Sequence, residues 1–200
     1  MKCHQCQKES NYLCSVCGKH VCSSHSKIQV ICNSHRKAVN ATKIEVREAT
    51  KKDHDVIGNI EDSILEHEEY EGSDEYWEKL WEGIEKNTLV AIVEGKVVGF
   101  LEYCKTVDPH ERVSFSTVDF TVNPCFQGLG VGKALFENVI KIARKEGIEK
   151  VYASTAANNL PTILFHLKNG AEIHGVESIG TPVERWGIKT DKSVSFVYSV

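Results

Sequence analysis

The chain of 200 residues has no long apolar run, and this absence excludes a helical membrane protein of the usual kind. No stretch approaches the roughly 18 consecutive apolar residues that cross a bilayer as a helix. The opening Met1-Lys-Cys-His lacks the apolar segment of a secretory signal. No internal repeat or low-complexity tract stands out, which argues against repeat architectures. We therefore expect a cytoplasmic protein, with one ordinary domain and a small appendage.

Acidic residues are scarce in the first part of the chain, and basic residues are the minority in the rest. Residues 1–52 carry a net charge of +7 and residues 53–200 a net charge of −11, which together give −4. Six of the eight cysteines lie within the first 32 residues. The change in composition falls near residues 40–44, so we predict a small module over 1–40 and a larger domain over 44–200.

The cysteines of the first part come in pairs that suit a metal. Four ligand pairs follow one another along the chain, two Cys-x2-Cys and then two Cys-x2-His. Two intervening residues let a tight turn aim both side chains of a pair at one ion. Without an export signal, metal is a better reading than disulfides. We predict two structural Zn²⁺ ions, whose binding would supply most of the folding energy of so short a segment. The predicted ligands are Cys3, Cys6, Cys14, Cys17, Cys22, His25, Cys32 and His35.

This spacing resembles the B-box zinc finger over about the first 36 residues. The resemblance implies interleaved binding, with the first and third pairs on one ion and the second and fourth pairs on the other. The family often has His at the place of Cys32, and zinc accepts either residue. Sequential pairing is an alternative, because spacing alone does not order the pairs. His4 and His20 are not among the predicted metal ligands. We expect the module to dock a protein partner or a substrate and rank nucleic acid last, because no base-reading helix is recognisable.

Alternating and helical apolar patterns predict a mixed sheet with flanking helices after residue 43. Thr50 to Asp53 form a capping box at the start of the first helix. Glu94-Gly95-Lys96 lies between two strand-like runs and predicts a hairpin. The other predicted elements are strands at 43–48, 113–122 and 150–155, helices at 73–86, 131–146 and 159–169, and a strand in the C-terminal tail.

A glycine-rich turn, "FTVNPCFQGLGVGKAL" at 120–135, joins a predicted strand to a predicted helix. Glycines at this place let backbone N–H groups approach an anion, most often a phosphate. The nucleotide P-loop does not fit, because Gln127 replaces its first Gly and Ala134 its hydroxyl residue. The dinucleotide fingerprint fails on the spacing of its glycines. What remains is Q-x-x-G-x-G from Gln127 to Gly132.

That loop resembles the acetyl-CoA loop of the GNAT N-acetyltransferase superfamily. The resemblance runs over about 44–200 and includes the "VEGKVVGFLEY" hairpin and "ASTAANNLPTILFHLKNGA". It implies an α/β (α+β) GNAT acyl-CoA N-acyltransferase fold and acetyl-CoA as cosubstrate. In the family a splayed strand holds the pantetheine arm, an Asn bonds it from the other side, and the loop holds the pyrophosphate. The implied binding residues are Phe120, Thr121, Val122, Gln127, Gly128, Leu129, Gly130, Val131, Gly132, Lys133 and Asn159, with Asn158 as a substitute for Asn159.

The implied reaction is acetyl transfer to a primary amine. An alkyl ammonium has a pKa near ~10.4, so a base must remove its proton. We expect Asp119 to be this base, with Glu102 and Glu111 as alternatives. The family's acid is a Tyr four residues before a Gly, where this chain has His166. His166 is therefore either the proton donor or a packed helix residue, and Tyr103, Tyr152 and Tyr198 have no assigned place.

The acceptor site in this fold borders the first two helices and their connection. Residues 61–85 contain eleven acids and one base, and an acidic rim attracts cations. A solvated helix face is the alternative. We predict a cationic acceptor, either a small amine or a basic protein tail. The competing function is an acetyl-CoA sensor or adaptor that binds without turnover.

Overall fold

The computed structural model describes residues 43–65, 69–70, 86–107, 112–185 and 188–200, together with Lys2 and two short strands near the N-terminus. Eight described strands form one sheet, in the order β3-β5-β6-β7-β8-β10-β9-β4. Every neighbouring pair is antiparallel except β7 and β8, which run parallel. The sheet strands are β3 (Glu45–Glu48), β4 (Glu69–Tyr70), β5 (Lys86–Val93), β6 (Lys96–Val107), β7 (Val113–Val122), β8 (Lys150–Ala156), β9 (Glu172–Arg185) and β10 (Ile188–Ser199).

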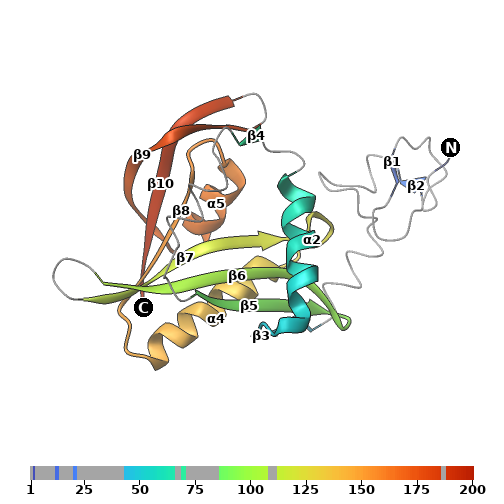
Figure 1. Cartoon of the computed structure of the whole chain (residues 1–200), viewed down its shortest axis with the longest axis horizontal. Coiled ribbons are helices and arrows are strands. Elements are labelled where there is room, and N and C mark those ends of the chain that lie inside the picture. Colours follow the sequence, from blue (N-terminus) through green and yellow to red (C-terminus); the bar gives the residue numbers. More distant parts are fainter. Residues whose placement is uncertain are drawn as a thin grey trace.

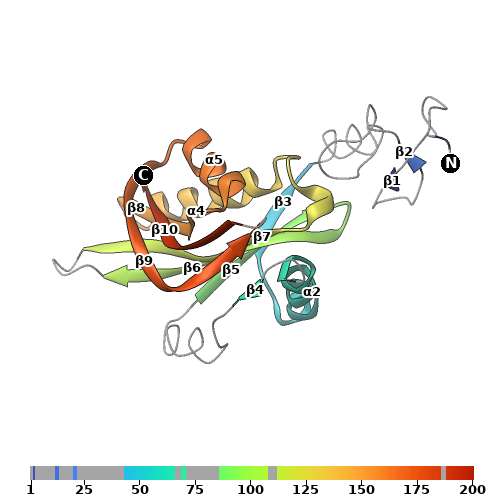
Figure 2. The same cartoon turned by 90° about the horizontal axis from the view of Figure 1, so that it is seen from above.

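Helices cover both faces of this sheet (Figures 1 and 2). Helices α4 (Val131–Lys145) and α5 (Leu160–Lys168) lie on one face, and α2 (His54–Leu65) lies on the other. Short 3-10 helices, η1 (Lys51–Asp53) and η2 (Pro124–Phe126), precede α2 and the glycine loop. Strands β1 (Tyr12–Leu13) and β2 (His20–Val21) form a separate antiparallel pair.

The core is divided by the sheet. On the α4 side, inward-facing residues of five strands pack against an apolar stripe of α4; the members include Leu101, Phe115, Leu135, Val139 and Phe196, each with none of its surface exposed. Burying one such side chain contributes about 1.5–3 kcal/mol. On the α2 side, a smaller cluster joins Ile60 to Val90 and Phe100. The larger cluster therefore fixes α4 against the strands that carry the glycine loop.

The corner between β3 and α2 is held by a buried carboxylate. Asp53 accepts hydrogen bonds from the Thr50 N–H at 2.7 Å and the Thr50 hydroxyl at 2.8 Å. Two Arg47 nitrogens contact its oxygens at 2.8 and 2.9 Å. The Arg47 guanidinium, with these hydrogen bonds, holds the pKa of Asp53 well below its usual range. The predicted capping box is therefore present, and it starts α2.

Most predicted elements are confirmed. The hairpin turns at Glu94 and Gly95, both with positive φ (50° and 75°), the backbone of a two-residue type I′ turn. Helix α4 ends two residues before Gly147, which has a φ of 71° and stops the helix as expected. The helix predicted over 73–86 overlaps the first residue of β5, Lys86, and otherwise lies outside the described residues. No described helix is long and apolar enough to cross a membrane.

Candidate active site

The sheet opens between its two parallel strands. Strands β7 and β8 pair at only two positions, Phe115 with Val151 and Ser116 with Tyr152. Beyond Ser116 the strands diverge toward the far end of β7 (Figure 1), while β8 stays paired with β10 on its other side. We call this divergence the fork. Along it, backbone N–H and C=O groups of both strands face a gap instead of a neighbouring described strand.

A β-bulge accounts for the fork. Glu102 of β6 pairs with Asp119 of β7, whereas the next residue, Tyr103, pairs with Thr117, so Val118 is an extra residue on β7. A bulge bends its strand and increases the local twist. It begins just after the last β7–β8 pair at Ser116. The splay expected at Phe120–Val122 is therefore present, and the bulge that precedes it is its physical cause.

Side-chain contacts shape the connection from β7 to the glycine loop. The Asn123 N–H donates to Val98 O at 2.9 Å, and its side-chain oxygen accepts the Cys125 N–H at 2.9 Å. The Gln127 amide donates to Val122 O at 2.9 Å. Gln127, predicted as a cofactor-binding residue, thus ties the loop back to the end of β7.

The loop delivers backbone N–H groups at the start of α4. Gly128 and Gly130 have φ values of 69° and 91°, and Gly130 is the N-cap. The first helical hydrogen bond is donated by the Ala134 N–H to Gly130 O at 2.9 Å. The N–H groups of residues 131–133 precede it and have no acceptor within the helix. Together with the helix dipole they form a place for an anion.

Gly132 serves a different purpose from its two neighbours. A Cβ at this position would lie 2.9 Å from the Phe120 Cζ and 3.5 Å from the Phe165 Cε2. Contacts below about 3 Å are essentially never seen for a real Cβ atom. The glycine therefore lets the start of α4 approach the Phe120 ring on β7, which brings the helix N-terminus beside the fork.

Asn159 lies at the other wall of the fork, where β8 leads into α5. It is 8% exposed and caps α5, because its side-chain oxygen accepts the Thr162 N–H at 3.4 Å. Its amide nitrogen donates to the Thr155 hydroxyl at 3.0 Å, and that nitrogen has a second hydrogen. The neighbouring Asn158 is equally buried. The structure thus brings Asn159 to the helix end that faces β7, and its contact with the pantetheine arm stays a prediction.

His166 is buried in an aromatic cluster. It is 2% exposed, stacks on Phe196 at 4.8 Å between ring centroids, and meets the edges of Phe136 and Phe165. Its Nδ1 lies 2.7 Å from the Tyr198 hydroxyl. Burial lowers the pKa of His166 to about 4, so the imidazole is neutral near pH 7. These contacts agree with the packed-residue interpretation of His166 rather than with a proton donor beside the thioester.

The predicted bases lie on the other face of the sheet. Asp119 and Glu102 are register partners, so their side chains share the face that carries α2. The Asp119 carboxylate accepts the Phe120 N–H and, at 3.3 Å, the Thr121 hydroxyl. Glu102 accepts the Thr88 hydroxyl at 3.1 Å. Glu111 lies outside the described residues.

Tyr152 is the side chain at the fork that the sequence did not place. As the register partner of Ser116 it belongs to the last β7–β8 pair. Its neighbours Val151 and Ala153 are buried on the α4 side, so the Tyr152 ring faces the α2 side, where it contacts His174 edge-on at 5.3 Å. Alternation within "KVYAST" indicates its face, but only the strand register shows that it stands at the fork.

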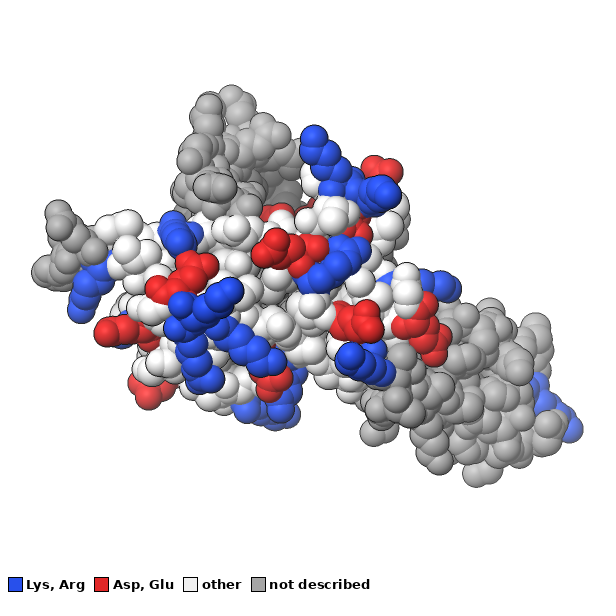
Figure 3. Space-filling view, turned by 90° about the horizontal axis from the view of Figure 1, so that it is seen from below, with Lys and Arg blue, Asp and Glu red and all other residues white. Residues whose placement is uncertain are grey.

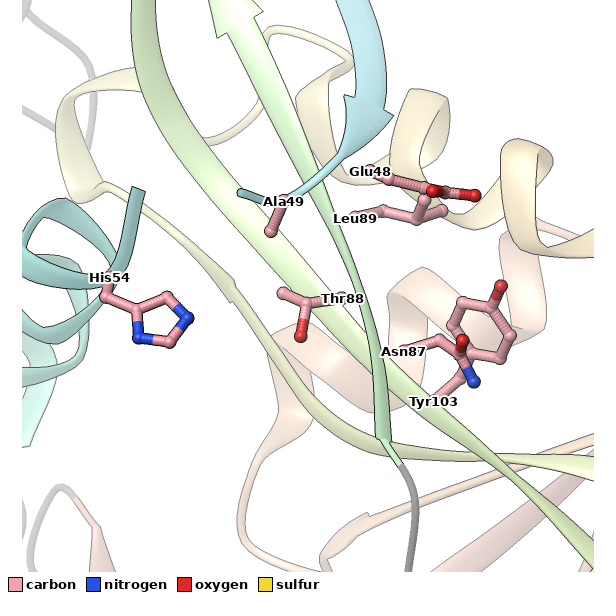
Figure 4. Close-up of a pocket in the computed structure, with 7 residues that line it drawn as sticks. All are labelled: Glu48, Ala49, His54, Asn87, Thr88, Leu89 and Tyr103. Carbon is pink, nitrogen blue, oxygen red and sulfur yellow. The ribbon is translucent and has the colours of Figure 1, made fainter. Parts of the chain in front are cut away.

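A cavity of about 290 Å³ lies elsewhere, at the edge of β5 just beyond the end of β3 (Figure 4). His54 and Thr88 lie on one side of β5, while Leu89 and Tyr103 lie on the other. No residue of the glycine loop lines it. Burial, with Glu146 and Glu48 nearby, raises the pKa of Tyr103. The cavity is therefore separate from the fork, and the fork is the better candidate for the active site.

The comparison with known families agrees with this geometry. A model described as the acetyltransferase (GNAT) family matches residues 55–171, more than half of the chain. The chain belongs to the GNAT acetyltransferase family. Membership of this family supports the predicted class of activity, an acyltransferase. The matched segment contains the fork, the bulge and the glycine loop.

Solved GNAT structures share the fold. IAA acetyltransferase from Bacillus cereus has a TM-score of 0.61 at 17% identity, over 79% of this chain and 100% of that chain. A GNAT acetyltransferase from Elizabethkingia anophelis with acetyl-CoA bound scores 0.60 at 16% identity, over 78% and 98%. Ribosomal-protein-alanine N-acetyltransferase from Brucella melitensis scores 0.60 at 21% identity, over 78% and 99%. The predicted GNAT fold, a mixed sheet with flanking helices, is confirmed.

The predicted zinc ligands, from Cys3 to His35, lie outside the described residues. Within the described part of the chain, no group of three or more His, Cys, Asp or Glu residues could hold a metal ion. Neither of the two cysteines found there is in a disulfide: Cys104 is buried in the sheet, and Cys125 is half-buried in η2. This GNAT domain thus uses its own cysteines for packing, and the zinc module stays a prediction from spacing.

Proposed function

We propose that this GNAT protein transfers an acetyl group from acetyl-CoA to a primary amine. The observation that carries the proposal is the fork with the glycine loop at its open end. The pyrophosphate of the coenzyme would bind the N–H groups of residues 131–133, and its arm would follow β7. The diverging part of β7, from Thr117 to Val122, is about 17 Å long. An arm extended along it ends at the Ser116–Tyr152 pair, where the reactive thioester would lie.

The chain's residues fit this cosubstrate. Gly128 and Gly130 use backbone that L-residues rarely adopt, and Gly132 lets the helix N-terminus lie against the Phe120 ring. Strand backbone along the fork supplies donors and acceptors for the two amides of the arm. A solved relative from Elizabethkingia anophelis contains acetyl-CoA, which supports the assignment of the ligand. Bound acetyl-CoA supplies an activated acetyl thioester.

Asp119 is proposed to act as the base. Its place, just after the bulge on the α2 side, is where an acceptor amine would meet the thioester. The carboxylate, directly or through water, takes a proton from the acceptor ammonium; nitrogen then bonds to the acetyl carbon and gives up a second proton to water, and the carbon–sulfur bond breaks. Glu102, its register partner, is the alternative base.

The departing thiolate needs a proton, and two side chains compete to supply it. His166 occupies the family position but is 2% exposed and bonded to Tyr198. Tyr152 stands at the fork, and no hydrogen bond from its hydroxyl joins it to another described residue. We propose Tyr152 as the donor, and the proton taken up by the base returns to its hydroxyl through water.

We propose a cationic acceptor on the basis of the eleven acids in residues 61–85, most of which lie outside the described residues. One solved relative is a ribosomal-protein-alanine N-acetyltransferase, which supports an amine acceptor on a protein. On the face seen in Figure 3, basic and acidic side chains are interspersed, which offers no continuous basic surface for nucleic acid there.

The experiment is a panel of amines, from small polyamines to basic peptides, incubated with acetyl-CoA while release of free coenzyme A thiol is followed. We expect turnover with at least one cationic acceptor and little with acidic peptides. Binding of acetyl-CoA without thiol release on any acceptor would instead support the sensor or adaptor, the competing function.

We further propose that residues 1–40 bind two Zn²⁺ ions through the eight predicted ligands and dock a partner or the acceptor. Four consecutive ligand pairs support it. Metal analysis of the purified chain should give about two zinc ions per chain, and a value near zero or one would contradict the assignment. A cytoplasmic location, where such cysteines stay reduced, belongs to the same proposal.

A further inference from the structure

Helix α5 exposes an apolar stripe that no described residue covers. Leu160, Leu164 and Leu167 are 58%, 42% and 40% exposed. They are spaced i, i+4 and i+7, which places them on one face of the helix. The helix also buries His166 on a different face, against the sheet. It is therefore apolar on two faces, and only one of them is used by the fold of the described chain.

Three consecutive residues show where the exposed stripe points. Successive residues of a helix are about 100° apart. Phe165 faces α4, with its ring 6.1 Å from the Phe136 ring, and His166 faces β10, stacked on Phe196. Leu167 is a further step round, on the side of α5 away from α4. Helix α4 packs on β5, β6 and β7, and β9 follows β10 in the strand order, so the side of α5 away from α4 lies toward β9.

Strand β9 continues the apolar surface. Ile173 and Val176 are 56% and 61% exposed. Their register partners on β10, Phe196 and Val194, are buried on the α5 side of the sheet, so Ile173 and Val176 face the same side one strand further out. We call Leu160, Leu164, Leu167, Ile173 and Val176 the α5–β9 surface. It holds five of the eight large apolar side chains that are exposed in the described chain.

The edge of β9 beside this surface is open. Its outer neighbour, β4, pairs only with Val183 and Glu184. From residue 172 to residue 182, β9 has no partner on that side among the described strands. Natural edges are usually blunted by Lys or Pro, and the only such residue from 172 to 182 is Pro182, next to the β4 pair. An open edge beside an apolar stripe is the kind of surface that accepts another strand.

We propose that the α5–β9 surface is the interface of a homodimer in which the two β9 edges pair antiparallel. A two-fold axis brings a surface against itself, so one identical partner satisfies both the strand edge and the apolar stripe. The five side chains expose on the order of 450 Å² per chain, the size of a functional patch. Two copies, with the strand edges added, reach the roughly 1,000 Å² or more that a specific interface needs. Exposed Lys168 and Glu172 lie at the rim with opposite charges, which suits mutual pairing.

Analytical ultracentrifugation of the full chain tests the dimer. At micromolar concentrations we expect twice the chain mass of 22.4 kDa. Val176→Lys and Leu164→Lys each place a charge in the interface and should weaken dimerisation at least tenfold. Val113→Lys, at a 45% exposed apolar position on β7, is the matched control and should leave the dimer intact.

Circular dichroism of each variant should match the parent, because all three positions are exposed. A parent chain that sediments as a monomer at all micromolar concentrations would overturn the proposal. The α5–β9 surface would then serve another partner. A dimer unaffected by both lysine substitutions would also overturn it, since the interface would then lie elsewhere. Both outcomes are independent of acetyl transfer, which is measured separately.

Discussion

Glycine recurs in the loop for two different physical reasons. Gly128 and Gly130 have positive φ, where an L-residue costs about 1–2 kcal/mol. Gly132 has an ordinary helical backbone but no room for a Cβ against Phe120. A substitution at any of the three therefore affects stability as well as binding. Tests of the anion site must therefore compare two variants with the same backbone strain, such as Gly130→Asn and Gly130→Asp.

His166 should make stability depend on pH. Its folded pKa of about 4 lies below the ordinary 6.5, so the folded protein rejects a proton that the unfolded chain accepts. Stability from this group is complete above pH 6.5 and is lost as pH falls from 6.5 to 4, by up to about 3 kcal/mol. Urea unfolding of the parent and of His166→Phe at pH 7 and pH 4.5 measures this. The free energy of unfolding of the parent, relative to that of His166→Phe, should be smaller at pH 4.5 than at pH 7. The same relative value at both pH values would show that the imidazole is not buried in its neutral form.

Turnover distinguishes the two proposed proton donors. If His166 only packs, His166→Phe should keep a kcat close to that of the parent. Tyr152→Phe removes a hydroxyl at the fork and should lower kcat by roughly 10²–10⁴-fold, with little change in acetyl-CoA affinity. The reverse pattern, a large loss with His166→Phe and none with Tyr152→Phe, would return the role to His166.

At the scale of elements, local features could be predicted and pairings between distant strands could not. The Glu94–Gly95 hairpin and the start of α4 follow from turn and loop chemistry within a few residues. The bulge at Val118 depends on the pairing of β7 with β6, and the two-residue register of β7 with β8 depends on segments more than thirty residues apart. The position of Tyr152 follows from that register, so the sequence left it unassigned.

The same limit explains His166. Sequence spacing aligned it with the family's catalytic Tyr and left two interpretations open. The choice depends on Tyr198 and Phe196, which are thirty or more residues further along and meet the imidazole only because β10 lies beneath α5. The zinc ligands and the helix predicted over 73–86, apart from Lys86, lie outside the described residues, so they stay predictions.

At the scale of the whole molecule, the proposed sites of acetyl transfer and of dimerisation involve different strands of the sheet. The fork lies between β7 and β8, near the middle of the strand order, whereas β9 stands two places further out. Pairing of two β9 edges would lengthen the sheet without covering the fork or the start of α4. The proposed dimer is therefore compatible with two open acetyl-CoA sites.

The central claim is that the loop at the start of α4 binds the pyrophosphate of acetyl-CoA. Calorimetric titration of acetyl-CoA into the parent, Gly130→Asn and Gly130→Asp tests it most directly. The two variants share shape and backbone strain and differ by one negative charge. We expect the parent to bind, Gly130→Asn to bind more weakly, and Gly130→Asp to lose at least a further tenfold, or about 1.4 kcal/mol, because its carboxylate faces the pyrophosphate. Equal affinities for Gly130→Asn and Gly130→Asp, or no binding by the parent, would contradict the account.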